Sequence, residues 1–528
     1  MNKLFIKIIN DKKITVVCLF IFAFLINWYS ANLGVMPIDT FAFFDSSYSI
    51  LQNKLPIRDF WITTGLTVDY FQAFFFKILG PNWKSYVVHS SLINSLTTIT
   101  FYFFLKNYNL NKYLTLIYTI SFATLCYPVS GTPFAYLHSY TFSLIIIFLF
   151  FIAVNKNYKI IWFFLPFIFL LTFFSMQTPG IYIILLISIY SIFYFIKFKK
   201  KKEFYFFVLG NFSSLFLFFL FIYLTKTPLI DLLYQYFLFP ISIAEGRFSS
   251  DLTAYVRLSD QINFKRIFGD FKFIHIFLSP LIFIFLYSIL KDKKFFLLNS
   301  IILISVFLFI FNQINQANQI YIFSLIPLIA SVLNININYY NFDKKLIYLI
   351  LIFLFFSTFK YYDRYNLNRK FLDIENFDKS LAIDAQIIDK KLKNLKWITP
   401  SYVFKDSVEE IETIKLALET IKEDNRNILI ITHYQFFSLL LEKKINILNR
   451  WYLWDNNSHP TENHKYFRFY KNFVDKKMDI ENIEVIYLLG FQNRHFLKLN
   501  KYFDNKCFNN YTLVENKFSQ HNLINCKN

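Results

Sequence analysis

Long apolar blocks, separated by short basic stretches, dominate the first two thirds of the chain. A helix that crosses a lipid bilayer needs roughly 20 mostly apolar residues. The pattern therefore predicts an α-helical polytopic membrane protein with about eleven membrane-spanning helices, at residues 14–33, 85–105, 112–130, 136–154, 159–175, 178–196, 204–224, 273–290, 295–311, 319–335 and 344–358. The composition changes near Tyr361, so we expect a membrane domain over 1–360 and a soluble domain over 361–528.

The lysines predict which loops face the cytoplasm. They precede the first span and recur in every second loop, while the loops between contain few. Because basic loops stay on the cytoplasmic side, we expect the N-terminus inside and the C-terminus outside. The outer parts are then the loop 34–84, the turn 127–136, the loop 225–272 and the tail. This pattern accounts for the formal charge of +20 without a nucleic-acid partner.

The tail has the pattern of a small α/β domain. Residues 407–423 have the apolar period of a helix and precede a continuous apolar run at 427–432, and a second run occupies 484–490. Helices that alternate with buried strands are typical of α/β layers. His433 and Tyr434 follow the first run, where ligands favour the strand end, although a structural role is the alternative. Outside the helix and strands, Cys507 and Cys526 could pair in an oxidising compartment.

The first outer loop carries the polar residues of greatest chemical interest. Asp39 follows the first span closely, and residues 40–51 have too few charges for a solvated loop. We expect this segment and 68–79 to form short helices at the membrane interface. An acidic group at that depth is a candidate functional residue, and Arg58 offers donors that match a lipid phosphate. An ion pair of Arg58 with Asp59 or Asp39, which would only fix the loop, is the alternative.

The order of these residues resembles the first-loop signature of the GT-C glycosyltransferases, in particular the bacterial relatives of the dolichyl-phosphate-mannose protein mannosyltransferase and aminoarabinose transferase group. That signature is Asp-Glu, a helix ending in Gly-Gly, and then Pro-Tyr-Arg-Asp-Phe. Here Asp39 precedes a run at 56–60 that reads Pro-Ile-Arg-Asp-Phe. Thr40 replaces the Glu, and Asn-Lys at 53–54 replaces the Gly-Gly. The motif match covers residues 39–105.

The resemblance implies a GT-C fold and an inverting transfer of a sugar from a polyprenyl-phosphate-linked donor. The acceptor would be lipopolysaccharide, another envelope glycan or a protein, on the outer side of the bacterial cytoplasmic membrane. In that family the first acidic residue after span one is the catalytic carboxylate, which assigns this role to Asp39. Inversion needs a base for the acceptor hydroxyl and cations for the departing phosphate. No cofactor is expected. A divalent metal stays open as an alternative but, with Thr40 in place of the Glu, is not indicated.

Several basic residues are candidate phosphate partners. Arg58 and Asp59 of the motif are expected to contact substrate. Arg247 and Arg257, in the second long outer loop, are also expected to bind substrate. Lys265 and Arg266 follow in the same loop. That loop could be a mobile lid over the lipid head group or a solvated connection.

Three further polar positions fall on the predicted outer side. His138 begins the fourth span and Gln177 lies at the turn before the sixth. Either could line the substrate, or be a satisfied interfacial histidine and a turn residue respectively. Amides at 312–319 could bind sugar hydroxyls or form only a polar loop.

Two other functions fit the predicted topology. A lipid-linked-sugar flippase or transporter would carry internal repeats and charged or broken helices at mid-membrane, and few of these features are evident. An O-antigen ligase or polymerase would keep its arginines in a large late outer loop, so the loop 225–272 keeps that alternative open. A structural scaffold would not need the residues between Asp39 and Phe60.

Overall fold

The computed structural model describes residues 11–248, 257–291, 295–317, 321–399, 404–452, 457–490, 508–515 and 517–523. The chain forms two compact units, each assembled from separate stretches. The first unit comprises Met1–Ala31, Val87–Leu220 and Leu258–Phe371, and the second comprises Asn32–Tyr86, Phe221–Arg257 and Leu372–Asn528. The second unit thus contains all of the first predicted outer loop, part of the second and most of the tail.

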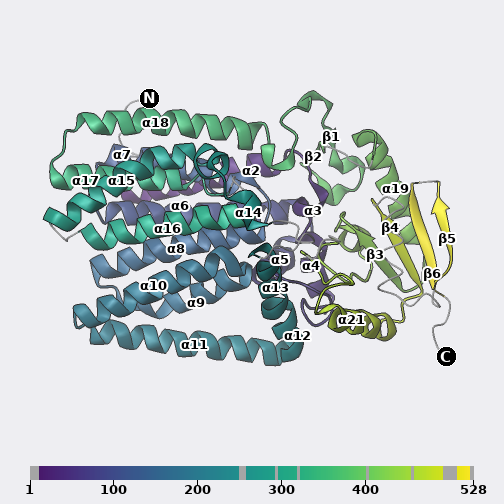
Figure 1. Cartoon of the computed structure of the whole chain (residues 1–528). Helices are drawn as coiled ribbons and strands as arrows, with labels where there is room; N and C mark the ends of the chain where they lie inside the picture. The colour runs from purple at the N-terminus through teal and green to yellow at the C-terminus, as the bar shows by residue number, and fades with distance from the viewer. Residues whose placement is uncertain are drawn as a thin grey trace. The chain divides into compact units, whose positions relative to one another are not determined.

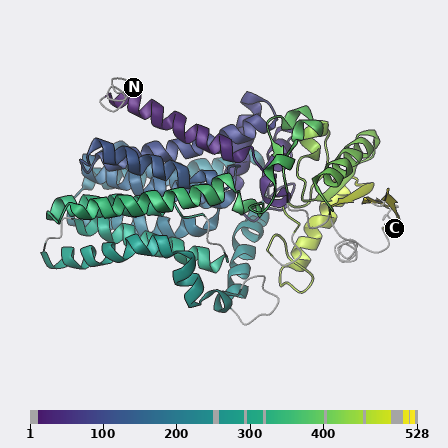
Figure 2. The same cartoon turned by 90° about the horizontal axis from the view of Figure 1, so that it is seen from above.

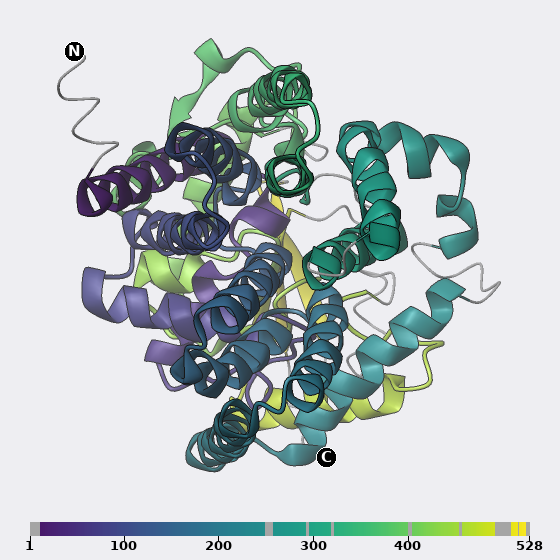
Figure 3. The same cartoon turned by 90° about the vertical axis from the view of Figure 1, so that its left-hand side faces the viewer.

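The first unit consists mainly of long apolar helices, which lie side by side in Figures 1 and 3. They are α2 (Lys12–Ala31), α6 (Trp83–Lys106), α7 (Lys112–Leu125), α8 (Ala135–Lys156), α9 (Lys159–Ser175), α10 (Gln177–Lys197), α11 (Lys201–Thr225), α15 (Lys272–Lys291), α16 (Phe296–Asn315), α17 (Leu325–Tyr340) and α18 (Lys345–Tyr361). Helices α6 and α11 extend a few residues into the second unit. A helix therefore occupies the position of every predicted span.

Seven helices among the described residues are long and apolar enough to cross a membrane. They are α2, α8, α10, α11, α15, α16 and the helix that begins with α18, while α9 and α17 are apolar but shorter. Helix α6 is less apolar because its polar side chains join helices inside the unit: the Asn94 amide donates to the carbonyls of Ala23 and Ala123 at 2.8 and 3.1 Å. The polytopic helical class is supported, and the count of eleven spans stays a prediction.

The second unit contains the short helices of the first loop and the α/β tail. The first-loop helices are α3 (Pro37–Thr40), α4 (Phe44–Leu51) and α5 (Leu66–Leu79). The next stretch forms α12 (Leu229–Leu233), a π-helical turn (Tyr234–Leu238) and α13 (Phe239–Phe248). The tail contributes α19 (Ser407–Glu423), α20 (Phe437–Leu441) and α21 (Phe467–Ile480), visible with their sheet in Figure 2. The helices predicted at 40–51 and 68–79 correspond to α4 and α5.

The tail sheet has the order β3-β4-β6-β5. Strands β3 (Ile428–Thr432) and β4 (Val485–Leu489) are parallel and buried throughout, as their continuous apolar runs predict. Strands β5 (Phe508–Val514) and β6 (Phe518–Leu523) form an antiparallel hairpin that the sequence reading missed. A separate two-stranded ladder joins β1 (Ile383–Asp384) to β2 (Lys396–Trp397).

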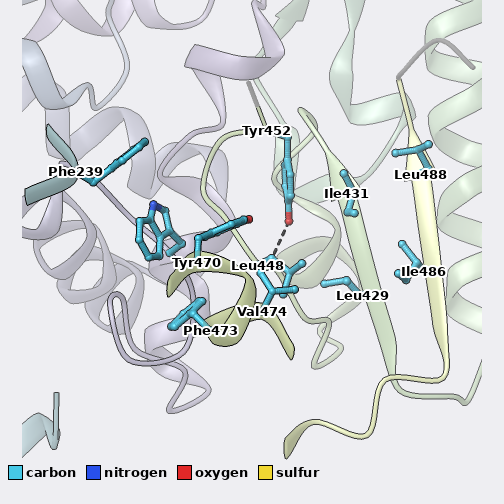
Figure 4. Packing of buried hydrophobic residues seen from close by; sticks show 11 residues of the cluster. Phe239, Leu429, Ile431, Leu448, Tyr452, Tyr470, Phe473, Val474, Ile486 and Leu488 are labelled. Carbon is cyan, nitrogen blue, oxygen red and sulfur yellow. Dashed lines mark hydrogen bonds between the residues drawn. The ribbon is translucent and has the colours of Figure 1, made fainter. Parts of the chain in front are cut away.

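One face of this sheet packs on an aromatic cluster (Figure 4). Its members are Trp61, Phe239, Leu429, Ile431, Leu448, Tyr452, Tyr470, Phe473, Val474, Ile486 and Leu488. Trp61 from the first loop makes edge contacts with Phe239 at 5.9 Å and Tyr470 at 5.1 Å between ring centroids. The members of this cluster come from all three stretches of the second unit. Because burying aromatic rings contributes strongly to stability, the cluster holds these stretches together.

Candidate functional site

Asp39 lies on α3, a helix of four residues that begins at Pro37. Proline at the first helical position fixes the backbone where no amide donor is needed. The residue as a whole retains some exposure to solvent, while burial of its carboxyl group raises the pKa to about 7. A carboxylate with a pKa near 7 can accept a proton from a hydroxyl group more readily than an ordinary aspartate at neutral pH.

The surroundings of Asp39 include residues from two stretches of the second unit. Tyr86 lies within electrostatic range of the carboxylate, and its hydroxyl accepts a hydrogen bond from the Phe43 backbone at 3.3 Å. The indole N–H of Trp451 donates to the carbonyl of Ile38, the residue before Asp39, at 3.0 Å. The backbone that carries Asp39 is therefore held from the tail as well as from its own loop.

A buried ion pair lies next to these contacts. The Arg450 guanidinium contacts the carboxylate of Asp69, and these side chains are 1% and 0% exposed. The same guanidinium donates to the Thr64 carbonyl, and Ser46 donates to Asp69 at 2.6 Å. The Arg450 guanidinium also lies 4.5 Å from the ring centre of Phe43. A charge taken out of water needs partners of this kind.

Gly65 is the residue before α5 and has a φ of +80°, a conformation in which a side chain is strained. A Cβ at this position would lie 2.4 Å from the Phe43 ring and 2.7 Å from the Arg450 Nη1 atom. Glycine therefore permits the close approach of Phe43 and Arg450, which the resemblance did not anticipate.

Asp45, on α4, is a second carboxylate whose pKa burial raises to about 7, although backbone donors oppose the shift. Its two oxygens accept from the backbone N–H groups of Ser438 and Leu439, both at 2.9 Å. These donors belong to the first turn of α20, where helices leave amides unpaired. Asp45 therefore serves the structure as the acceptor for a helix that lacks a side-chain cap of its own.

Arg58 and Asp59 form the ion pair that the sequence left as the alternative to phosphate binding. Arg58 contacts Asp59 at 2.6 Å and donates to the carbonyls of Thr225 and Asn53 at 3.0 and 2.7 Å. Lys477 approaches Asp59 from α21 at 3.1 Å. Burial opposes ionisation of Asp59, but the hydrogen bonds from its partners hold its pKa below the usual value. This arrangement fixes the loop; substrate contact by Arg58 and Asp59 stays a prediction.

The basic residues of the second long loop divide between the units. Arg247 lies on α13, with one guanidinium nitrogen 3.4 Å from the side-chain oxygen of Asn457. Glu245, on the same helix, forms an ion pair with Lys465 of the tail at 2.6 Å. Arg257 is described, but residues 249–256 before it lie outside the described part of the chain. Arg266 belongs to the first unit and pairs with Asp270 at 2.6 Å.

The predicted residues His138 and Gln177 belong to the first unit. His138 is fully buried, with Nδ1 2.6 Å from the Tyr127 hydroxyl and Nε2 2.9 Å from Nε2 of His89. These contacts match the alternative of a satisfied histidine. Gln177 is the first residue of α10, and the neighbouring Thr178 contacts Gln316 at 3.4 Å. A substrate-lining role for Gln177 stays a prediction.

At the end of β3, the hydroxyl of Tyr434 donates to Glu410 of α19, a buried carboxylate whose pKa burial raises. The indole of Trp397 donates to the other oxygen of Glu410 at 3.0 Å. These bonds give Tyr434 a structural partner. Over the residues that the structure describes, histidine, cysteine, aspartate and glutamate side chains form no group of three or more that could hold a metal ion. Cys507 and Cys526 lie outside the described residues.

Sequence reasoning missed Arg450, Trp451 and Asp69. Their only signal is the presence of charged or hydrogen-bonding side chains within apolar surroundings, in Leu448-Asn-Arg-Trp-Tyr452 and in α5. Comparison with known proteins adds no assignment, because no family model matches the chain and no curated protein matches it.

Proposed function

We propose that the protein is a GT-C type integral-membrane glycosyltransferase that transfers a sugar from a polyprenyl-phosphate donor to a cell-envelope acceptor. The observation that carries the proposal is Asp39, a carboxylate whose pKa burial raises to about 7 and which follows shortly after the first apolar helix ends at Ala31. Its place in the chain matches the catalytic position of the resembled family, and its environment suits a base. The predicted setting is the outer side of a bacterial cytoplasmic membrane, with about eleven spans.

In this mechanism Asp39 accepts the proton of the acceptor hydroxyl as the oxygen attacks the anomeric carbon. The bond between that carbon and the phosphate oxygen breaks, and the polyprenyl phosphate leaves with the bonding electrons. Arg58, Arg247 and Arg257 are the proposed partners of the departing charge, because guanidinium groups present several donors in a geometry that matches phosphate oxygens. Stabilising charge that develops in the transition state is a major source of catalytic rate.

The test is mass spectrometry of envelope glycans and polyprenyl-linked sugars from cells with the intact protein, no protein, or equally expressed Asp39→Asn. We expect the deletion and Asp39→Asn to lose the same sugar while its lipid-linked donor accumulates. Asp384→Asn is the matched control, because it makes the same change at a carboxylate that is half exposed and paired with Lys396. A normal glycan profile with Asp39→Asn would refute the catalytic assignment. Loss of the lipid-linked sugar from the outer leaflet would instead favour a flippase.

A further inference from the structure

The tail segment 448–451 lies against the first loop at two places. Its backbone pairs with Trp61, whose N–H donates to the Leu448 carbonyl at 2.7 Å and whose carbonyl accepts from Arg450 N–H at 3.3 Å. The side chain of Arg450 reaches Asp69 and Thr64 beyond this point. The next side chain, Trp451, reaches Ile38 in the other half of the loop. Consecutive tail residues thus hold both halves of the first loop.

Helix α3 cannot fix the position of Asp39 by itself. It has four residues and no cap from the Met36 side chain. Its local bonds run from the N–H groups of Asp39 and Thr40 to the Met36 carbonyl at 3.0 and 2.7 Å and from Phe41 N–H to the Pro37 carbonyl at 3.2 Å, and the Thr40 hydroxyl accepts from Met36 N–H at 2.9 Å. Forming one helical turn costs more conformational entropy than one hydrogen bond returns, so a helix this short depends on its neighbours. The Trp451 indole supplies such a contact one residue before Asp39, and its ring lies against Phe43, 6.1 Å away between centroids.

We propose that Trp451 is a positioning residue for Asp39, and that the tail holds the catalytic base in place through segment 448–451. The inference rests on the proposed function, because it takes Asp39 as the base. It gives the C-terminal domain a role in the reaction that is independent of which acceptor the protein uses.

The hydrogen bond from Trp451 to Ile38 can be tested without removing a charged group from the surroundings of Asp39. Among the described residues, Tyr86 is a titratable side chain within electrostatic range of the carboxylate. Arg450 approaches Trp451 to within 5.4 Å of the ring centre, but its guanidinium is paired with Asp69. Loss of the Trp451 donor should therefore act on Asp39 through backbone position and access of water, without the removal of a charge.

The test measures protonation of Asp39 in the purified full-length protein. Dicyclohexylcarbodiimide, which modifies protonated carboxyl groups in apolar surroundings, is applied across pH 4–9, and modification of Asp39 is quantified by peptide fragmentation. In the intact protein we expect modification to fall with a midpoint near pH 7, where burial places the pKa of this carboxyl. Trp451→Phe keeps an aromatic ring and removes the donor, and should lower the midpoint by about one pH unit as water reaches the carboxylate.

Trp162→Phe is the matched control. It makes the same change on α9 of the first unit, at an indole N–H that has no acceptor among the described residues. We expect this variant to leave the Asp39 midpoint unchanged. Trp451→Leu, which removes the donor and the ring, is the second variant and should lower the midpoint at least as far. An unchanged midpoint in either folded Trp451 variant would overturn the proposal, as would a midpoint near pH 4 in the intact protein.

The reaction itself provides the second readout. With the lipid-linked donor identified in the glycan experiment, Trp451→Phe should lower kcat and move the rising limb of the pH profile, with KM for the donor little changed. The carbodiimide measurement needs no substrate. A midpoint shift without any transfer activity would therefore refute the proposed function while the hold of Trp451 on Asp39 stands, and transfer with an unshifted midpoint would refute the hold alone.

Discussion

Substituting one member of the Asp69–Arg450 ion pair should destabilise the second unit more than replacing both members. Both side chains are essentially inaccessible to solvent, so screening does not weaken the effect. Arg450→Met leaves Asp69 with Ser46 as its remaining side-chain donor, and Asp69→Asn leaves a buried guanidinium without a counter-charge. Removing one partner of a buried pair costs about 3–5 kcal/mol, whereas replacing both can be close to neutral.

The double variant should therefore be more stable than the sum of the single losses predicts, by at least about 3 kcal/mol. Thermal unfolding followed by tryptophan fluorescence suits the measurement, because Trp61, Trp83 and Trp397 are fully buried in this unit. For a unit of this size, each single loss lowers the apparent Tm by roughly 6–20 °C. The half-exposed pair Asp384–Lys396 is the control and should show coupling below about 1 kcal/mol. Additive losses at Asp69 and Arg450 would refute the reasoning.

Three further predictions follow from single positions. Gly65→Ala should lower stability by about 1–3 kcal/mol in the same thermal assay, because its Cβ meets Phe43 and Arg450 at a positive φ; an unchanged Tm would contradict this. Asp45→Ala should cost about 2–4 kcal/mol and speed proteolysis near α20, since two backbone donors lose their acceptor, whereas Asp45→Asn should lose less. For Asp39, the folded pKa of about 7 exceeds the ordinary value of 3.8, so its ionisation opposes folding increasingly as pH rises between them. The free energy of unfolding of Asp39→Asn should therefore exceed that of the intact protein by an amount that grows from pH 4 to pH 7 and stays constant above pH 7, at about 2 kcal/mol after allowance for partial exposure. A difference that does not change with pH would count against the raised pKa.

Local patterns in the sequence predicted the elements of the structure well. Apolar length and period identified the long helices, the two first-loop helices, α19 and the buried strands β3 and β4, because burial on both faces leaves a continuous apolar run. The hairpin of β5 and β6 was missed. Its strands, Phe508–Val514 and Phe518–Leu523, mix amides with apolar residues and show no strict alternation. Pairing with a neighbouring strand stabilises such segments more than their own pattern does.

The candidate site was predicted only in its first-loop part. The resemblance identified Asp39, Arg58 and Asp59, and the Arg58–Asp59 pair was foreseen as one of two alternatives. The contacts of Arg450 and Trp451 could not be predicted, because they join residues 381 and 413 positions away in the chain. A single sequence carries no signal for pairings at that separation, and each side chain alone is equally compatible with a solvated loop.

The assembly of the second unit from three separate stretches sets an order on its synthesis. Asp69 leaves the ribosome 381 residues before its partner Arg450, an interval of roughly 20–80 s at ordinary elongation rates. Throughout that time the first loop has its carboxylates but not the tail residues that pair with them. A nascent chain that stops short of Arg450 would retain the helices of the first unit and still display an unfinished first loop, a surface that quality-control proteases can distinguish from the completed protein.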